Sequence, residues 1–186
     1  GVREIKNFLK FMVSKGVLAK DLIEAGFLVE GRSTLYSPFE QRIIFPIQDS
    51  MGRFCGFGGR IFKKGDTRAK YYNSKETDWF YKGKLLFGLH LAKKGMQDKK
   101  CAYLVEGYTD CVAMVQNGFL NTVATLGTAC THDHLKILSR YINTLYVLYD
   151  GDSAGQKAIL RLTQLCWNVN LDLQIVSLPK DEDPAS

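Results

Sequence analysis

Strand-like and helical patterns alternate along the second half of the chain, and this alternation limits the fold more than any other feature of the sequence. Short apolar runs typical of β-strands occupy residues 101–105, 121–126, 144–149 and 173–178. Helical patterns occupy the intervals between them, at residues 110–117, 132–141 and 154–168. Strands that alternate with helices form βαβ units, whose strands lie parallel in one sheet. We therefore expect an α/β domain with a mainly parallel sheet over residues 99–186.

The first half of the chain has a different texture, which predicts a smaller basic α+β subdomain over residues 1–98. Apolar residues recur at helical spacing over residues 3–15, and a second short helix is expected over residues 18–25. Two β-rich runs, residues 42–47 and 54–62, flank a turn at residues 49–52 and predict a hairpin. Residues 63–84 have no clear period, a helix is expected over residues 85–95, and we place the domain boundary in the polar stretch 96–100.

Charge divides between the same two halves. Residues 1–100 contain 20 Lys and Arg against 10 Asp and Glu, a balance of +10, whereas residues 101–186 contain 5 against 9, a balance of −4; together they give the formal charge of +6. A basic half joined to an acidic half suggests a polyanion-binding surface beside concentrated carboxylates. A solvated surface on which charges happen to segregate would give the same balance.

Several classes of protein are excluded by composition. No apolar run approaches the roughly 18 residues of a membrane span, so no membrane role is expected. The first residues carry no signal-peptide apolar core. The five cysteines are an odd number without zinc spacing, which favours free thiols in a reducing compartment.

Two carboxylate motifs follow predicted strands of the parallel sheet. Glu106 ends the first strand and Asp110 opens the next helix. Asp150 and Asp152 follow the third strand, two residues apart, which directs their side chains to one side of extended chain. Ligands bind at this edge of open α/β sheets, and four carboxylates there would repel one another without a proton or a cation. The alternative is that Asp110 and Asp152 only cap helices and that Glu106 is a solvated loop residue.

The chemistry of these side chains narrows the choice of metal ion. Oxygen ligands favour Mg²⁺ or Mn²⁺ over zinc, and two such ions could align an attacking and a leaving oxygen in phosphoryl transfer. An EF-hand loop that began at Asp150 would need acids where Ala154 and Arg161 stand, so calcium sensing is excluded. A haloacid-dehalogenase phosphatase also uses Asp-x-Asp after a strand, but it does not account for Glu106 and Asp110.

Cationic and aromatic side chains interleave in the basic half. They are Arg68, Lys70, Tyr71, Tyr72, Asn73, Lys75, Trp79, Lys82 and Lys84. Phosphate attraction combined with base stacking would use such a mixture, although a loop with solvated charges would look the same. The glycine-rich run 56–60 does not match the dinucleotide-binding spacing and fits a strand where backbones approach closely. His132 and His134 are weak metal candidates because no third ligand is suggested nearby.

In their order along the chain, these motifs resemble those of bacterial DnaG-type primases. The matching segments are residues 42–47 (RIIFPI), 56–60 (GFGGR), 70–74 (KYYNS), 82–83 (KG), 106–110 (EGYTD), 150–155 (DGDSAG), 178–179 (LP) and 183–184 (DP). The two acidic motifs resemble Toprim motifs, which topoisomerases and some nucleases share. The upstream basic motifs narrow the resemblance to primase, and it covers nearly the whole chain from about residue 3.

The resemblance implies a Toprim-like domain that makes short RNA primers from ribonucleoside triphosphates on a single-stranded DNA template, in the bacterial cytoplasm at the replication fork. It implies that Glu106, Asp150 and Asp152 hold Mg²⁺ or Mn²⁺, as one or two ions, and that Asp110 supports the acidic cluster. It also implies a groove for nucleotide and nucleic acid. The residues of that groove would be Arg42, Arg60, Lys70, Tyr71, Asn73 and Lys82.

Departures from the family pattern qualify these expectations. Lys75 stands where the family often has Pro, and Ala185 stands where a second late Asp is common, so Asp183 is a weaker metal candidate. The family's zinc-binding domain and the start of its N-terminal subdomain precede the matched region, and its helicase-binding domain follows it. We therefore expect a trimmed catalytic core without zinc, which meets the replicative helicase only through another domain and does not initiate alone.

Two other functions remain open at this point. A Toprim topoisomerase or nuclease would need a nucleophilic tyrosine or nuclease elements, which we do not identify in the sequence. A Toprim module that only binds nucleic acid is the non-enzymatic alternative. The intact acidic set argues against it, because binding alone has no need to concentrate carboxylates near phosphates.

Overall fold

The computed structural model describes residues 4–31, 34–167, 169–179 and 182–185, in two compact units. Unit 1 comprises residues 1–47 and 56–80, and unit 2 comprises residues 48–55 and 81–186. Unit 2 therefore includes the tip of a hairpin whose strands otherwise belong to unit 1. The domain division predicted at residues 98 and 99 stays a prediction, and helix α3 (Leu89–Lys99) passes through that point.

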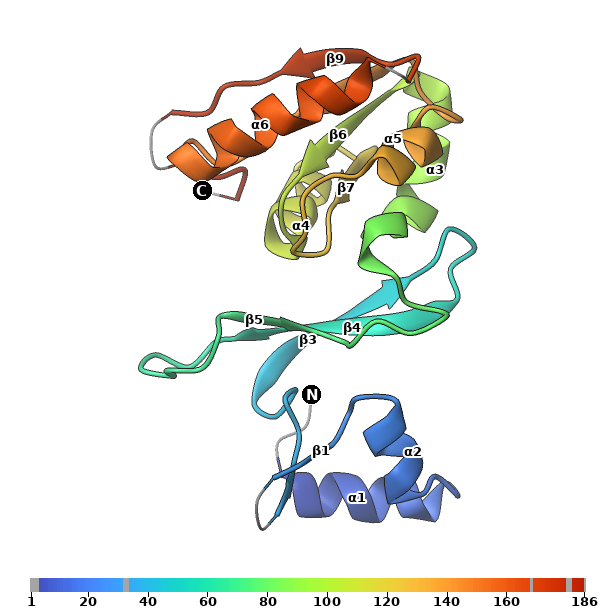
Figure 1. Ribbon diagram of the computed structural model, residues 1–186, viewed down its shortest axis with the longest axis vertical. Helices are drawn as coiled ribbons and strands as arrows, with labels where there is room; N and C mark the ends of the chain where they lie inside the picture. The colour runs from blue at the N-terminus through green and yellow to red at the C-terminus, as the bar shows by residue number, and fades with distance from the viewer. Residues whose placement is uncertain (1–3, 32–33, 168, 180–181, 186) are drawn as a thin grey trace. The chain divides into compact units, whose positions relative to one another are not determined.

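Unit 1 contains two short helices and two small sheets. Its elements are α1 (Ile5–Ser14), α2 (Ala19–Glu24), β1 (Val29–Glu30), β2 (Leu35–Tyr36), β3 (Arg42–Gln48), β4 (Phe54–Ile61) and β5 (Tyr71–Asn73). Strands β1 and β2 pair with each other, and the larger sheet has the order β3-β4-β5, in which β5 pairs antiparallel with β4 (Figure 1). The two helices and the hairpin were predicted. The very short strands β1, β2 and β5 were not, because three residues or fewer give no period.

One face of the larger sheet carries an aromatic cluster. The ring centroids of Phe39 and Tyr72 are 5.2 Å apart, and those of Phe27 and Phe57 are 5.0 Å apart. Edge-to-face pairs at such distances add stability beyond the area that they bury. A Cβ atom at Gly59 would lie 2.9 Å from the side chain of Arg42, so the glycine makes room for that side chain over the strand. The expected close approach at the glycine-rich run is therefore a close approach of side chains to the strand.

Unit 2 is built on a four-stranded parallel sheet. Its elements are the 3₁₀-helix η1 (Lys82–Lys84), α3, β6 (Cys101–Val105), α4 (Tyr108–Gln116), β7 (Thr122–Ala124), α5 (His132–Leu138), β8 (Thr144–Val147), α6 (Ser153–Cys166) and β9 (Asp172–Ile175). The strand order is β7-β6-β8-β9, and every pairing is parallel. The predicted α/β class with its mainly parallel sheet is confirmed. Among the described residues, no helix combines the length and apolar character required to cross a bilayer.

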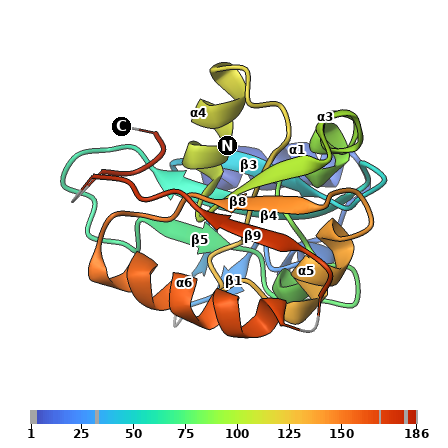
Figure 2. The same cartoon turned by 90° about the horizontal axis from the view of Figure 1, so that it is seen from above.

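Alternate residues of the central strand β6 face two apolar clusters. Leu104 belongs to a cluster that includes Leu135 of α5 and Leu162 of α6. Val105 belongs to a second cluster with Met114 of α4. Figure 2 shows α4 on one side of the sheet and α6 on the other. Both faces of the central strand are thus covered, which explains why β6 is apolar throughout, whereas three of the four residues of the edge strand β9 are exposed.

The helix expected over residues 85–95 is displaced toward the C-terminus. Gly88 adopts a positive φ of 80°, and the helix begins only at Leu89. Phe87 is extended and forms an antiparallel bridge with Ala124 of β7. The helix then continues to Lys99, and Met96 is fully buried, so most of the polar stretch 96–100 is helical rather than a linker.

Candidate active site

The strand order creates a topological switch point at the carboxyl edge of the parallel sheet. From β6 the chain moves to β7 on one side, and from β7 it crosses to β8 on the other side. Ligands bind in open α/β sheets at the crevice where the direction of the connections reverses. Glu106 directly follows β6, and Asp150 follows β8, so one carboxylate lies on each side of this crevice.

The structure brings Glu106 and Asp150 together. The main-chain N–H of Asp150 donates a hydrogen bond to Oε1 of Glu106 at 3.3 Å. Burial raises the pKa of the Glu106 carboxyl, and the negative charge of Asp150 raises it further; Asp152 and Asp110 contribute in the same direction. The four predicted carboxylates therefore act on one another, and a cation among them would relieve this repulsion.

Asp110 and Asp152 also satisfy the helix starts that follow the two strands. Oδ2 of Asp110 accepts a hydrogen bond from the N–H of Gly107 at 2.9 Å, at the first turn of α4. Oδ1 of Asp152 accepts one from the N–H of Gly155 at 2.8 Å, at the first turn of α6. The capping role considered from the sequence is therefore real, and it coexists with the electrostatic effect on Glu106.

The donor set suits a hard divalent cation held by few protein ligands. Within the part of the chain that the structure describes, no three Asp, Glu, His or Cys side chains are grouped so as to hold a metal ion. Mg²⁺ is usually bound through one or two carboxylates together with water and substrate phosphates, and a third protein ligand is not required. Glu106 and Asp150 meet this description. Asp183, the weaker candidate, accepts a hydrogen bond from the N–H of Ala185.

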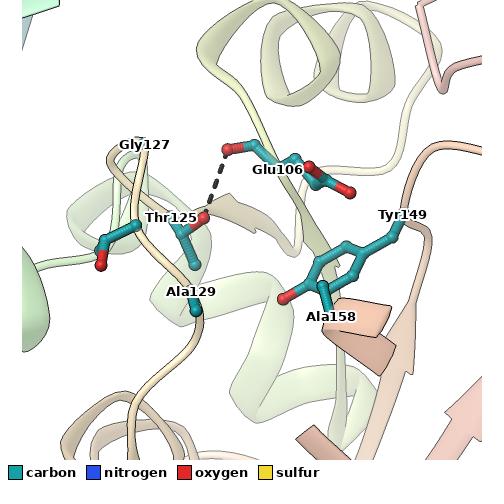
Figure 3. A pocket seen from close by; sticks show the side chains of 7 residues that line it. Glu106, Thr125, Gly127, Ala129, Tyr149 and Ala158 are labelled. Atoms are coloured by element: carbon teal, nitrogen blue, oxygen red, sulfur yellow. Dashed lines mark hydrogen bonds between the residues drawn. The ribbon is translucent and has the colours of Figure 1, made fainter. Parts of the chain in front are cut away.

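Beside Glu106 lies a pocket of about 360 Å³ that was not predicted from the sequence (Figure 3). Its lining consists of Glu106, Thr125, Gly127, Thr128, Ala129, Tyr149 and Ala158. The hydroxyl of Thr125 donates a hydrogen bond to the main-chain carbonyl of Glu106 at 3.3 Å. Thr125 directly follows β7, so the pocket spans the ends of three neighbouring strands. A polar residue directly after an apolar run was the signal available in the sequence.

The predicted nucleic-acid-binding residues of unit 1 separate into two groups, and the first lies on one face of β4 and β5. Arg60 pairs with Tyr71 across the two strands, and Asn73, two residues on, faces the same side. The guanidinium of Arg60 and the ammonium of Lys70 lie 5.8 Å and 5.7 Å from the centre of the Tyr71 ring. This face, which we call the Arg60 face (Arg60, Lys70, Tyr71, Asn73), lies opposite the aromatic cluster around Tyr72.

Arg42 forms the second group and has a structural role. Its side chain is only 5% exposed. Its guanidinium donates hydrogen bonds to the carbonyls of Pro38 at 2.9 Å, Lys70 at 3.2 Å and Gly59 at 3.4 Å. These bonds tie the main chain before β3, in β4 and before β5 to one nearly buried guanidinium, so the structure favours a supporting role for Arg42 over direct contact with a phosphate.

Lys82 belongs to unit 2, where its main chain is anchored by α5. Nε2 of His134 lies 2.9 Å from the carbonyl of Lys82, and Nδ1 of His134 accepts a hydrogen bond from the N–H of Thr131 at 3.2 Å. The hydroxyl of Thr131 donates to the carbonyl of Gly83 at 2.6 Å. His134 is fully buried, and this burial lowers its pKa. Both of its ring nitrogens serve the structure, so it is no metal ligand, in agreement with the sequence-based expectation.

Comparison with known proteins finds a matching family for each half of the chain. Residues 2–93 match the family model described as the N-terminal domain of the DNA primase catalytic core, and residues 103–186 match a Toprim-like family model. A DNA primase of Clostridium acetobutylicum is 42% identical over 180 residues, which cover 96% of this chain and 30% of the relative. The chain thus spans about a third of the length of the curated relatives that it matches.

Solved structures agree with these relatives. The zinc-binding and RNA polymerase domains of the Aquifex aeolicus primase superpose with a TM-score of 0.90 at 34% identity, over 99% of this chain and 45% of that one. The structure of a DnaG primase catalytic domain bound to single-stranded DNA superposes with a TM-score of 0.82 at 38% identity, over 94% of this chain and 58% of that one. The similarity therefore extends over both units of the fold.

Proposed function

Because the chain belongs to the DnaG-type DNA primases, as a catalytic-core and Toprim region, we propose that it synthesises short RNA primers on single-stranded DNA for bacterial DNA replication. The observation that carries the proposal is the meeting of Glu106 and Asp150 at the switch point of the parallel sheet. Concentrated carboxylates favour metal-dependent chemistry on phosphates over simple binding of nucleic acid. Such a primase would work in the cytoplasm at the replication fork.

The reaction is nucleotidyl transfer. The 3′-hydroxyl oxygen of the primer forms a bond to the α-phosphorus of a ribonucleoside triphosphate, the bond to the bridging oxygen breaks, and pyrophosphate and a proton leave. Toprim primase cores use divalent metal, and Glu106 and Asp150, with Asp152 nearby, would hold Mg²⁺ or Mn²⁺, which supplies positive charge to the phosphates when bound. Asp110 would hold the turn between β6 and α4, and with it Glu106, in position.

The Arg60 face is proposed to bind the template strand or the nucleotide. Lys70 and Tyr71 are exposed and Arg60 is half-buried, and cations beside an aromatic ring combine phosphate attraction with stacking. The related catalytic domain bound to single-stranded DNA supports the class of ligand. Lys82 remains a candidate contact by resemblance. We assign template binding and a share of nucleotide binding to residues 1–98, and metal-dependent chemistry to residues 99–186.

Extension of a supplied RNA primer on single-stranded DNA tests the proposal, because it does not depend on initiation. We expect incorporation of ribonucleotides that requires Mg²⁺ or Mn²⁺ and is lost in Glu106→Gln. Asp98→Asn, which removes an exposed carboxylate from α3, is the matched control and should extend normally. Strand cleavage or relaxation of supercoiled DNA without extension would instead indicate a Toprim nuclease or topoisomerase. Metal-independent DNA binding without any chemistry would indicate a binding module.

A further inference from the structure

The pocket beside Glu106 contains a hydroxyl that the fold does not use. Tyr149 is 4% exposed and lines the pocket. Figure 3 shows its hydroxyl end directed toward the loop residue Ala129. Among the described residues, no hydrogen bond to this hydroxyl is present. The hydroxyl oxygen itself is not fully buried but opens on the pocket, so water or a ligand there can form a hydrogen bond with it.

The size and lining of the pocket restrict what it can hold. Ligand pockets have volumes of roughly 300–1,000 Å³, and this one is at the lower end of that range. Its lining contains hydroxyls and small aliphatic side chains but no Lys or Arg. The only charged side chain is the carboxylate of Glu106, which repels an anion that arrives without a cation. A neutral group rich in hydroxyls fits these walls, whereas a phosphate does not.

The position of the pocket relative to the carboxylates points to a sugar. Glu106 belongs both to the proposed cation-holding pair and to the pocket wall, and Tyr149 immediately precedes Asp150 in the chain. A triphosphate held at the pair therefore has its next chemical group at the mouth of the pocket. In a nucleotide this group is the ribose, which carries hydroxyls that can accept a hydrogen bond from a tyrosine.

We infer that this pocket is the ribose subsite for a nucleoside triphosphate, and that the hydroxyl of Tyr149 donates a hydrogen bond to a sugar hydroxyl. The inference rests on the proposed function and adds the way in which a ribonucleotide is distinguished from its deoxy analogues. Tyr149 is thus a specificity-determining residue, and the loop of Gly127 to Ala129 forms the opposite wall.

The test compares ATP, 2′-deoxy-ATP and 3′-deoxy-ATP in the presence of Mg²⁺, by NMR titration of the whole chain. Loss of one neutral hydrogen bond corresponds to about three- to tenfold in affinity. We expect the affinity of Tyr149→Phe for ATP to fall by about three- to tenfold. Its affinity for one of the deoxy analogues should stay that of the wild type, so that the variant no longer distinguishes ATP from that analogue. The unfolding midpoint should not fall, because the lost hydroxyl has no partner in the protein. Equal losses for all three nucleotides, or unchanged discrimination, would overturn the inference.

A second variant tests occupancy of the pocket without touching the buried tyrosine. Ala129→Leu adds volume at an exposed loop position and should weaken binding of all three nucleotides alike. Unchanged affinity for ATP in Ala129→Leu would place the sugar elsewhere and refute the subsite. A wild-type chain that neither binds nucleotide nor extends a primer would refute the proposed function itself. Normal primer extension by the wild type, together with nucleotide binding by Tyr149→Phe that equals that of the wild type, would refute only the ribose placement.

Discussion

Asp150→Asn should stabilise the metal-free protein and at the same time abolish its response to metal. The main-chain N–H of Asp150 bonds to Glu106, and the substitution leaves that bond in place while it removes one of two interacting charges. Like charges separated by roughly 6 Å repel by about 3 kcal/mol at an effective dielectric constant of about 20. Salt and the water that reaches the crevice screen part of this, so we expect the free energy of unfolding to rise by about 1 kcal/mol.

The gain should depend on pH with a defined sign. The pKa of Glu106 is raised in the folded state by burial and by Asp150, so the native protein takes up a proton more readily than the unfolded chain. The repulsion is therefore present at neutral pH, where both carboxylates are ionised, and is relieved as the pH falls through the raised pKa of Glu106. The advantage of Asp150→Asn should be largest near neutral pH and should vanish in acid.

Metal reverses the order of stability. A ligand that binds only the native state stabilises it by RT ln(1 + [L]/Kd), which is about 1.4 kcal/mol at ten times Kd. The wild type should gain this amount in Mg²⁺ and the variant almost nothing, so that the wild type becomes the more stable protein. Thermal unfolding followed by circular dichroism, with chelator and with a Mg²⁺ series, measures both effects. Asp98→Asn should follow the wild type, and an equal Mg²⁺-dependent gain in Asp150→Asn would refute the assignment.

Three further predictions concern other parts of the two units. Loss of two phosphate contacts in an Arg60→Ala, Lys70→Ala double variant should reduce the salt slope of single-stranded DNA binding by about 1.4, because each contact contributes about 0.7; fluorescence anisotropy at several salt concentrations checks this, and an unchanged slope would contradict it. The wild type should lose stability as the pH falls below about 6.5, because burial lowers the pKa of His134 and the unfolded chain binds its proton more readily. The free energy of unfolding of His134→Gln at pH 7 should be lower by about 1–3 kcal/mol, since buried hydrogen bonds are lost, but it should change less with pH than that of the wild type. Urea titrations at several pH values measure both, and a pH dependence as steep as that of the wild type would argue against His134 as its origin. A methyl group at Gly155 would collide with main-chain atoms of Asp150, so Gly155→Ala should cost about 1–3 kcal/mol and weaken the Mg²⁺ response, and a variant with both properties intact would show that the turn tolerates the change.

The parallel sheet could be predicted because its signals are local. Each strand is a short apolar run, and a helical pattern separates it from the next one. The placement of Glu106 and Asp150 at the carboxyl edge followed from the same pattern. The order β7-β6-β8-β9 did not, because periodicity does not tell which strands become neighbours. The switch point between the two carboxylates therefore came only from the three-dimensional structure.

The roles of Arg42 and Tyr149 illustrate a second limit. A charge count treats Arg42 like Arg60, although the first is buried among carbonyls and the second lies beside Tyr71 on the opposite face of the sheet. Tyr149 belongs to an apolar run, so the sequence places it in the core, as the structure largely does. Its availability to a ligand depends on a gap left by the loop of Gly127 to Ala129, which no local pattern encodes.

The central position of β6 has a consequence for synthesis on the ribosome. This strand emerges before every other strand of its sheet, and β7 can cover only one of its edges. The other edge stays unpaired while α5 is still being synthesised. During that time Cys101–Val105 is an uncharged apolar edge strand that can pair with another polypeptide and aggregate. The hazard lasts until residues 144–147 emerge, when Thr144 pairs beside Cys101 and Val147 beside Leu104.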